Sequence, residues 1–164
     1  MKKDDRVCCF FGHREISEND KVKNILYENI EKLITEENVR TFLFGSKSKF
    51  DDLCHEVVTR LKEKYPLVKR IYVRAEFPYI DDSYKAYLLG KYEDTYYPEK
   101  LINAGRAVYV KRNYEMIDNS DFCICYYDTA YNPKKRKSGA GIAFAYAVKK
   151  KKKIINTAEI KAKK

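Results

Sequence analysis

Glycine, basic and polar side chains gather at three places where chemistry on a phosphate group could occur. Two of these places directly follow apolar runs, and the third precedes a helical pattern near the C-terminus. The residues are Gly12-His13-Arg14, Gly45-Ser46 followed by Asp51, and Ser138-Gly139. Glycine lets the backbone approach a phosphate closely, helix N-terminal amides favour an anion, and a guanidinium can hold a phosphate through two hydrogen bonds. The pattern predicts a site for a small phosphate-bearing ligand.

The glycine loops do not match the signatures of two large enzyme classes. Neither G-x-G-x-x-G nor G-x-x-x-x-G-K-[ST] occurs in them. This disfavours an ATPase or an ordinary dinucleotide dehydrogenase. Glycines also end strands for purely steric reasons, so a structural role for Gly12 and Gly45 stays open.

A further polar pair, Arg112 and Asn113, is expected at the start of a short helix over 112–119. There the asparagine could cap the helix, while the arginine either contacts a ligand or pairs with Asp118 or Asp121. Carboxylates expected near the same region are Glu76, Asp81, Asp82 and Asp128, and the last is a ligand-binding candidate. Spacing alone assigns none of them as a catalytic base.

The elements that must position these residues alternate between β-rich runs and helical patterns. We expect strands over 6–11, 39–44, 70–74, 106–110, 122–127 and 153–156. Helices are expected from a cap at Ser17, from a cap at Asp51 to before Pro66, within 83–93, over 112–119 and from 142 to about 150. This alternation predicts an α/β protein with a mainly parallel sheet and helices on both faces. Because parallel strands end at one edge, the candidate residues should lie close together there.

The chain has the size and composition of one domain over residues 1–164. Its side chains are 45% hydrophobic and 14% aromatic, enough to bury a core. No apolar run approaches the roughly 18 residues of a membrane span, and the N-terminus lacks a signal-peptide core, so we expect a cytoplasmic protein with no membrane partner. The tyrosine-rich stretch 77–105 is interpreted as a variable insert or lid, whose tyrosines either stack on a base or cover the sheet.

The five cysteines are odd in number and lie mostly in apolar runs, so we expect reduced core thiols and no metal site.

The formal net charge of +10 is unevenly distributed along the sequence. Residues 134–164 hold 12 of the 34 Lys and Arg but one of the 24 acids, whereas residues 1–133 hold 22 basic and 23 acidic side chains. This basic C-terminal segment, which includes the tail 157–164, has two interpretations. Its lysines either stabilise the C-terminal end of a helix and lie in solvent at the turn that follows, or they bind nucleic acid.

Five short motifs, taken in order, resemble those of a known family. They are Phe10-Phe11-Gly12-His13-Arg14, Gly45-x4-Phe50-Asp51, Lys111-Arg112-Asn113-x2-Met116-Ile117-Asp118-x2-Asp121, Tyr127-Asp128, and Lys137-Ser138-Gly139-Ala140 with Tyr146-Ala147 behind it. Over about residues 7–156 they resemble the YpsA-like family of the SLOG superfamily, named for the Smf/DprA and LOG proteins. The resemblance implies a single Rossmann-like, doubly wound domain whose pocket takes a nucleotide or a nucleotide-derived ligand.

Departures from the family pattern bear on function. The P-G-G-x-G-T-x-x-E signature of the phosphoribohydrolase branch is absent, and Ala140 stands where a threonine hydroxyl is common. The resemblance therefore favours a sensing or regulatory binding domain over an enzyme. Two alternatives stay open: an N-glycosidic or phosphoribosyl-bond hydrolase or transferase using Glu76 or Asp128, and a single-stranded nucleic-acid binder whose affinity falls steeply with salt. Because relatives of this fold frequently pair, a homodimer is expected.

Overall fold

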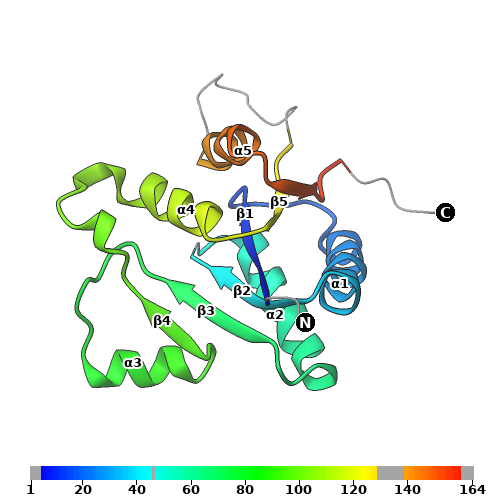
Figure 1. Cartoon of the computed structure of the whole chain (residues 1–164), viewed down its shortest axis with the longest axis horizontal. Helices are drawn as coiled ribbons and strands as arrows, with labels where there is room; N and C mark the ends of the chain where they lie inside the picture. The colour runs from blue at the N-terminus through cyan, green and yellow to red at the C-terminus, as the bar shows by residue number, and fades with distance from the viewer. Residues whose placement is uncertain (1–4, 46, 129–138, 160–164) are drawn as a thin grey trace.

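An all-parallel sheet forms the centre of the computed structural model, which describes residues 5–45, 47–128 and 139–159. Within these ranges the sheet has six strands in the order β4-β3-β2-β1-β5-β6 (Figure 1). They are β1 (Arg6–Gly12), β2 (Val39–Phe44), β3 (Lys69–Val73), β4 (Asp94–Tyr96), β5 (Phe122–Tyr126) and β6 (Lys153–Asn156). The chain moves outward from β1 to β4 and then crosses to β5 on the other side of β1. This is the predicted doubly wound, Rossmann-like α/β fold.

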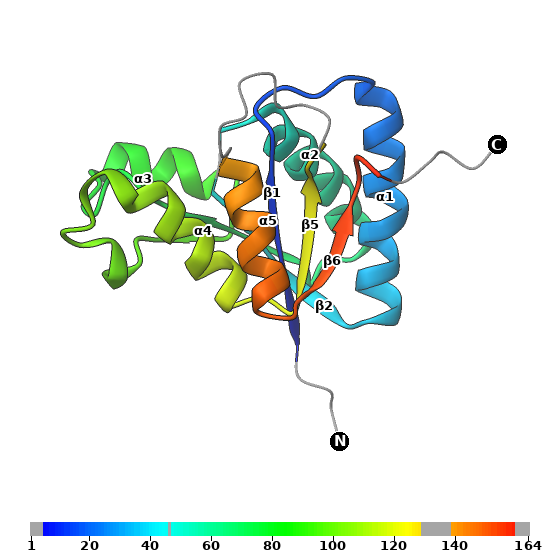
Figure 2. The same ribbon diagram turned by 90° about the horizontal axis from the view of Figure 1, so that it is seen from above.

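Five α-helices flank the sheet in the described part of the chain. They are α1 (Asn19–Glu36), α2 (Lys49–Lys64), α3 (Asp82–Leu89), α4 (Val108–Asp118) and α5 (Gly139–Lys149), with 3₁₀ turns at Glu99–Leu101 and Gly105–Ala107. In Figure 2, α4 and α5 lie in front of the sheet and α2 lies behind it. None of the described helices is long and apolar enough to cross a membrane.

The alternation of side chains along β1 divides the core between the two faces of the sheet. Cys8 and Phe10 join a cluster with the buried residues of α1 and α2. Cys9 and Phe11 point the other way and pack with α4 and α5. All five cysteines are buried free thiols, as predicted, and burial raises the pKa of Cys9 well above its ordinary value. The apolar run of β1 is therefore buried on both sides, which is typical of a central parallel strand.

The first helix confirms its predicted apolar stripe but begins later than expected. The six stripe residues are all buried against the sheet: Val22, Ile25, Leu26, Ile30, Leu33 and Ile34. The helix starts at Asn19 rather than at a Ser17 cap, because Glu18 has a left-handed backbone (φ 56°) that interrupts the helix there.

The second helix is capped by Ser48, not by Asp51 as predicted. The Ser48 hydroxyl oxygen accepts a hydrogen bond from the Asp51 amide at 3.1 Å. Asp51 lies inside the first turn, and its carboxylate accepts a hydrogen bond from the Gly45 amide at 3.3 Å. The cap therefore lies three residues before the expected one, and the helix ends, as expected, before Pro66.

The strand predicted over 106–110 is wrong. This segment forms the Gly105–Ala107 turn and the first residues of α4, which begins at Val108. A short apolar run does not distinguish a strand from a helix by periodicity alone, and as a helix it places Arg112 and Met116 one turn apart on the buried side. Arg112 and Asn113 therefore lie inside the helix rather than at its cap. The stretch 77–105 contains the helix expected within 83–93, as α3, and the edge strand β4.

Candidate functional site

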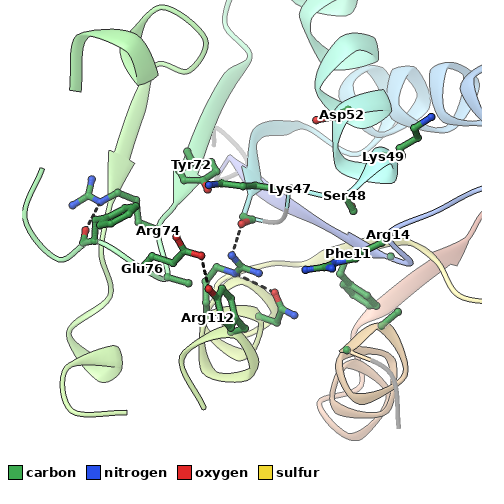
Figure 3. Close-up of a pocket in the computed structure, with 18 of the residues that line it drawn as sticks. Phe11, Arg14, Lys47, Ser48, Lys49, Asp52, Tyr72, Arg74, Glu76 and Arg112 are labelled. Atoms are coloured by element: carbon green, nitrogen blue, oxygen red, sulfur yellow. Dashed lines mark hydrogen bonds between the residues drawn. The ribbon is translucent and has the colours of Figure 1, made fainter. Parts of the chain in front are cut away.

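A cavity of about 650 Å³ lies at the carboxyl edge of β1, β2 and β3 (Figure 3). Its volume is within the range of pockets that hold small ligands. Six of the predicted site residues line it: Gly12, Arg14, Gly45, Arg112, Asn113 and Gly139. Ser46, Ser138 and the basic segment 134–137 lie outside the described residues. Elements far apart in sequence thus meet at the edge that the strand-end argument predicted.

His13 lies beside the cavity rather than in its lining. Its backbone amide donates to the Tyr126 carbonyl at 3.1 Å, and its ring Nε2 accepts the Asp128 amide hydrogen at 3.0 Å. The side chain is buried and packs on the Tyr127 ring at a centroid distance of 5.7 Å. His13 therefore joins the ends of β1 and β5, and Asp128 also lies outside the lining.

The glycines at the ends of β1 and β2 have a packing reason to be glycine. A Cβ on Gly12 would lie 2.7 Å from Phe50 Cδ2, and one on Gly45 would lie 2.8 Å from both Arg112 Cδ and Met116 Sδ. Steric packing, the structural role left open for Gly12 and Gly45 from the sequence, is therefore sufficient to explain why both residues are glycines. By contrast, a Cβ on Gly139 would meet no atom of the described chain within 4 Å.

Arg112 forms the floor of the cavity. Its guanidinium donates from Nη1 to the Gly45 carbonyl oxygen and from Nε to Asn113 Oδ1 at 3.3 Å, and it lies 5.7 Å from the centroid of the Tyr109 ring. The residue is 6% exposed, and this burial lowers the pKa of Arg112, while the nearby Asp51 carboxylate acts in the opposite direction.

Of the two alternatives left open for Arg112, the ion pair with Asp118 or Asp121 does not form. Asp118 accepts the Tyr146 hydroxyl at 2.8 Å, and Asp121 accepts the Val7 amide at 3.0 Å. Both carboxylates lie at or beyond the C-terminal end of α4, away from the second turn that carries Arg112. Arg112 therefore faces the cavity without a carboxylate in hydrogen-bond contact among the described residues.

Arg14 supplies an accessible cation. Its side chain is exposed and makes no hydrogen bond or ion pair with the described residues, and in Figure 3 it extends toward Arg112. Its carbonyl oxygen accepts the Lys49 amide at 3.0 Å, which ties the loop after β1 to the start of α2. Lys47 also lines the cavity, with its side chain extending toward Tyr72 in Figure 3, whereas Lys49 extends away from Arg112 in the same view.

The first turn of α2 offers fewer amides than a helix N-terminus usually presents. The Lys49 amide is bound to Arg14 and the Asp51 amide to Ser48. Positive charge at this end of the cavity therefore comes mainly from side chains. The other helix that reaches the cavity is α5, whose first residues, Gly139 and Ala140, line it.

The candidate carboxylates have different surroundings. Glu76 lines the cavity and accepts a hydrogen bond from the Tyr109 hydroxyl. Asp81 instead caps α3 by accepting the Tyr84 amide at 2.7 Å, and Asp82 occupies the first turn of that helix. Two cavity carboxylates were not identified from the sequence, Glu15 and Asp52. Both come from segments adjoining predicted site residues, so a wider window around each strand end would have included them.

Aromatic side chains form a further part of the cavity lining, and among them Tyr84 belongs to the tyrosine-rich stretch that was expected to stack on a base or cover the sheet, whereas Tyr72, Phe77 and Tyr109 were not predicted from the sequence. Tyr72, Phe77, Tyr84 and Tyr109 line the cavity. Burial raises the pKa of Tyr72 to about 12, so its hydroxyl is neutral at neutral pH. The sequence did contain a signal for part of this lining. The segment from Arg74 to Phe77 directly follows the third strand, so it lies at the same carboxyl edge of the sheet as the other candidate residues.

Arg74 holds that segment in place. Its Nε donates to the Phe77 carbonyl at 3.0 Å, and its Nη1 donates to Thr95 Oγ1 at 3.1 Å. The side chain is 9% exposed. Although Arg74 lines the cavity, these bonds give it a positioning role for the loop that carries Glu76. Within the described ranges, no group of three or more His, Cys, Asp or Glu side chains is placed to hold a metal ion.

The doubly wound sheet and the cavity at its carboxyl edge define a Rossmann-like α/β protein. The chain matches the model of the YspA SLOG family over residues 7–160, and it belongs to that family. No curated protein matches the chain. Family membership relates the fold to proteins that bind nucleotide-related ligands and to glycosidase-like proteins.

Proposed function

We propose that the cavity binds a nucleotide or a nucleotide-derived ligand, in a sensing or regulatory role. The observation that carries the proposal is the convergence of Arg14 and Arg112 on one cavity (Figure 3). Glu15, Asp52 and Glu76 also line the cavity, but neither guanidinium makes a hydrogen bond or ion pair with a carboxylate of the described residues, so an anion bound between the two arginines would relieve their repulsion. Lys47 adds a third positive charge at the same edge, and guanidinium groups suit phosphate oxygens well.

The opposite wall of the cavity suits the rest of a nucleotide. Tyr72, Tyr84 and Phe77 line this wall, and aromatic side chains are suited to contact a base. A pocket that combines an arginine-rich end with an aromatic wall matches a molecule with a phosphate at one end and a flat heterocycle at the other. The sequence lacks the phosphoribohydrolase signature, which favours binding of the ligand over its hydrolysis.

The hydrolase alternative has one supporting observation, because Glu76 is a carboxylate inside the cavity. Asp128, the other candidate for this chemistry, does not line it. The test of function must therefore measure both binding and the fate of the ligand.

Native mass spectrometry of the freshly purified protein, followed by a thermal-shift panel of nucleotides, cyclic dinucleotides, ADP-ribose species and short oligonucleotides, tests the proposal. A ligand present at 100 times its Kd should stabilise the wild type by about 2.7 kcal/mol. Arg14→Gln should reduce this stabilisation strongly. The matched control is Arg60→Gln, since Arg60 is exposed on α2 and does not line the cavity.

Three results would contradict the proposal. Equal stabilisation of wild type and Arg14→Gln by every ligand would place binding elsewhere. Stabilisation by oligonucleotides alone, abolished by salt, would favour the nucleic-acid alternative. Release of a free base from a bound nucleotide, detected by chromatography, would establish the hydrolase alternative.

A further inference from the structure

Glu76 and Tyr109 form a hydrogen-bonded pair in the wall of the cavity. The Tyr109 hydroxyl donates to Glu76 Oε1. Glu76 lies in the loop after β3, which Arg74 anchors, and Tyr109 lies in the first turn of α4. Two separate elements therefore hold the pair, and both residues also line the cavity.

The side chains of the pair can accept further hydrogen bonds, but they have no remaining proton to donate. The only hydroxyl proton of Tyr109 is directed at Glu76, which leaves lone pairs on Tyr109 Oη and on Glu76 Oε2. The hydrogen bond to Glu76 raises the pKa of Tyr109, against the opposing charges of Arg112 and Arg14, so the phenol keeps its proton at neutral pH. Within the described residues, Glu76 makes no other hydrogen bond or ion pair. Two adjacent acceptors suit a ligand group that presents two donors.

The position of the pair indicates which donors those are. The Arg112 guanidinium lies 5.7 Å from the centroid of the Tyr109 ring, so the acceptors adjoin the cationic end of the cavity. In a nucleotide the sugar hydroxyls lie close to the phosphates, whereas an exocyclic amino group lies on the far side of the base. The two donors nearest the phosphate subsite are therefore the vicinal hydroxyls of a ribose.

We propose that Glu76 and Tyr109 form a subsite for the 2′- and 3′-hydroxyls of a ribose, so that the cavity selects ribonucleotides over 2′-deoxyribonucleotides. This inference rests on the proposed function, because the phosphates must bind next to Arg112. Both side chains are exposed before a ligand binds, with Tyr109 48% exposed. A nucleotide bound over them excludes water, so a ligand that lacks the 2′-hydroxyl leaves one of these acceptors without a donor in the complex.

Isothermal titration calorimetry with ADP, IDP, CDP and UDP, each paired with its 2′-deoxy form, and with pyrophosphate alone tests the subsite; IDP and UDP lack the exocyclic amino group that ADP and CDP carry. At least one ribonucleotide should bind the wild type about tenfold or more tightly than its deoxy form. Glu76→Ala should reduce this ratio toward one while leaving pyrophosphate affinity unchanged or higher, because a negative charge is removed. Tyr109→Phe should reduce the ratio in the same direction. The matched control is Glu99→Ala, an exposed carboxylate outside the cavity, which should keep the wild-type ratio.

The outcomes separate this inference from the proposed function. Binding of pyrophosphate or nucleotides with a wild-type ribo-to-deoxy ratio of one would overturn the ribose subsite and leave the nucleotide site standing. A ratio that Glu76→Ala does not change would also overturn it. A dependence of affinity on the amino group of the base, lost in Glu76→Ala, would assign the pair to base recognition instead. Failure of pyrophosphate and of every nucleotide to bind would overturn both proposals.

Discussion

The Arg112 guanidinium donates a hydrogen bond to the carbonyl oxygen of Gly45, a residue 67 positions earlier in the chain. The same side chain occupies the space in which a Cβ on residue 45 would sit. One interaction thus joins α4 to the carboxyl end of β2 and requires a glycine there. The floor of the cavity depends on this pairing, whatever ligand the cavity takes.

Arg112→Met should lower the free energy of unfolding by about 1–3 kcal/mol, because the buried Gly45 carbonyl loses its charged donor. Urea unfolding followed by circular dichroism measures the effect. Arg106→Met is the control, since Arg106 is exposed and makes no hydrogen bond or ion pair with the described residues, and it should change stability by less than about 0.5 kcal/mol. Equal stability of the two variants would show that the hydrogen bond contributes nothing.

Gly45→Ala should destabilise the protein by about 1–3 kcal/mol, since the new methyl group would lie 2.8 Å from Arg112 Cδ and Met116 Sδ. Gly139→Ala is the matched substitution at another glycine of the cavity. No described atom lies within 4 Å of its new methyl group, and alanine favours the helix, so stability should be unchanged or higher. Thermal unfolding of both variants compares them, and a stable Gly45→Ala protein would contradict the packing argument.

His13→Ala should remove the ring acceptor of the Asp128 amide. We expect the free energy of unfolding to fall by about 1–3 kcal/mol, because a buried ring and its hydrogen bond are both lost. Hydrogen exchange by NMR gives a local readout: exchange at the Asp128 amide should accelerate, relative to the Lys49 amide, which is bound to Arg14. Unchanged protection at Asp128 would mean that another group holds that amide.

Glu93→Gln should make stability less dependent on acid pH. Partial burial alone would raise the pKa of Glu93, but hydrogen bonds from Arg70, at 2.7 Å from Nη2 and 3.0 Å from Nε, outweigh it and lower the pKa below its ordinary value. The stabilisation is therefore complete above the ordinary carboxyl pKa of about 4.3 and is lost as pH falls through the lowered value.

At pH 7 the Glu93→Gln substitution should cost about 1 kcal/mol, a modest value because the side chain is 28% exposed. Urea unfolding of wild type and variant between pH 7 and pH 3 should show the two stabilities converging in acid. A constant difference across this range would show that the charge of Glu93 is not what stabilises the pair.

Much of the fold follows from local patterns in the sequence. The stripe from Val22 to Ile34 predicted which residues of α1 are buried, and the apolar run of β1 predicted a central strand. Periodicity is a local property, so it can be recognised without knowing the partners. It failed over 106–110, where a short apolar run fits a strand as well as a helix and only packing of Met116 against the sheet distinguishes them.

The location of the candidate site was also predictable, because parallel strands all end at one edge, and Arg14 and Gly45 follow two of them. The roles of the residues were not predictable in this way. Three features depend on contacts between segments 33 to 67 residues apart in the sequence. They are the position of Arg112 in the floor of the cavity, the need for a glycine at residue 45, and the hydrogen bond between Tyr109 and Glu76. Such contacts arise only when the helices pack on the sheet, since side-chain direction and burial are set by that packing and not by the neighbours in sequence.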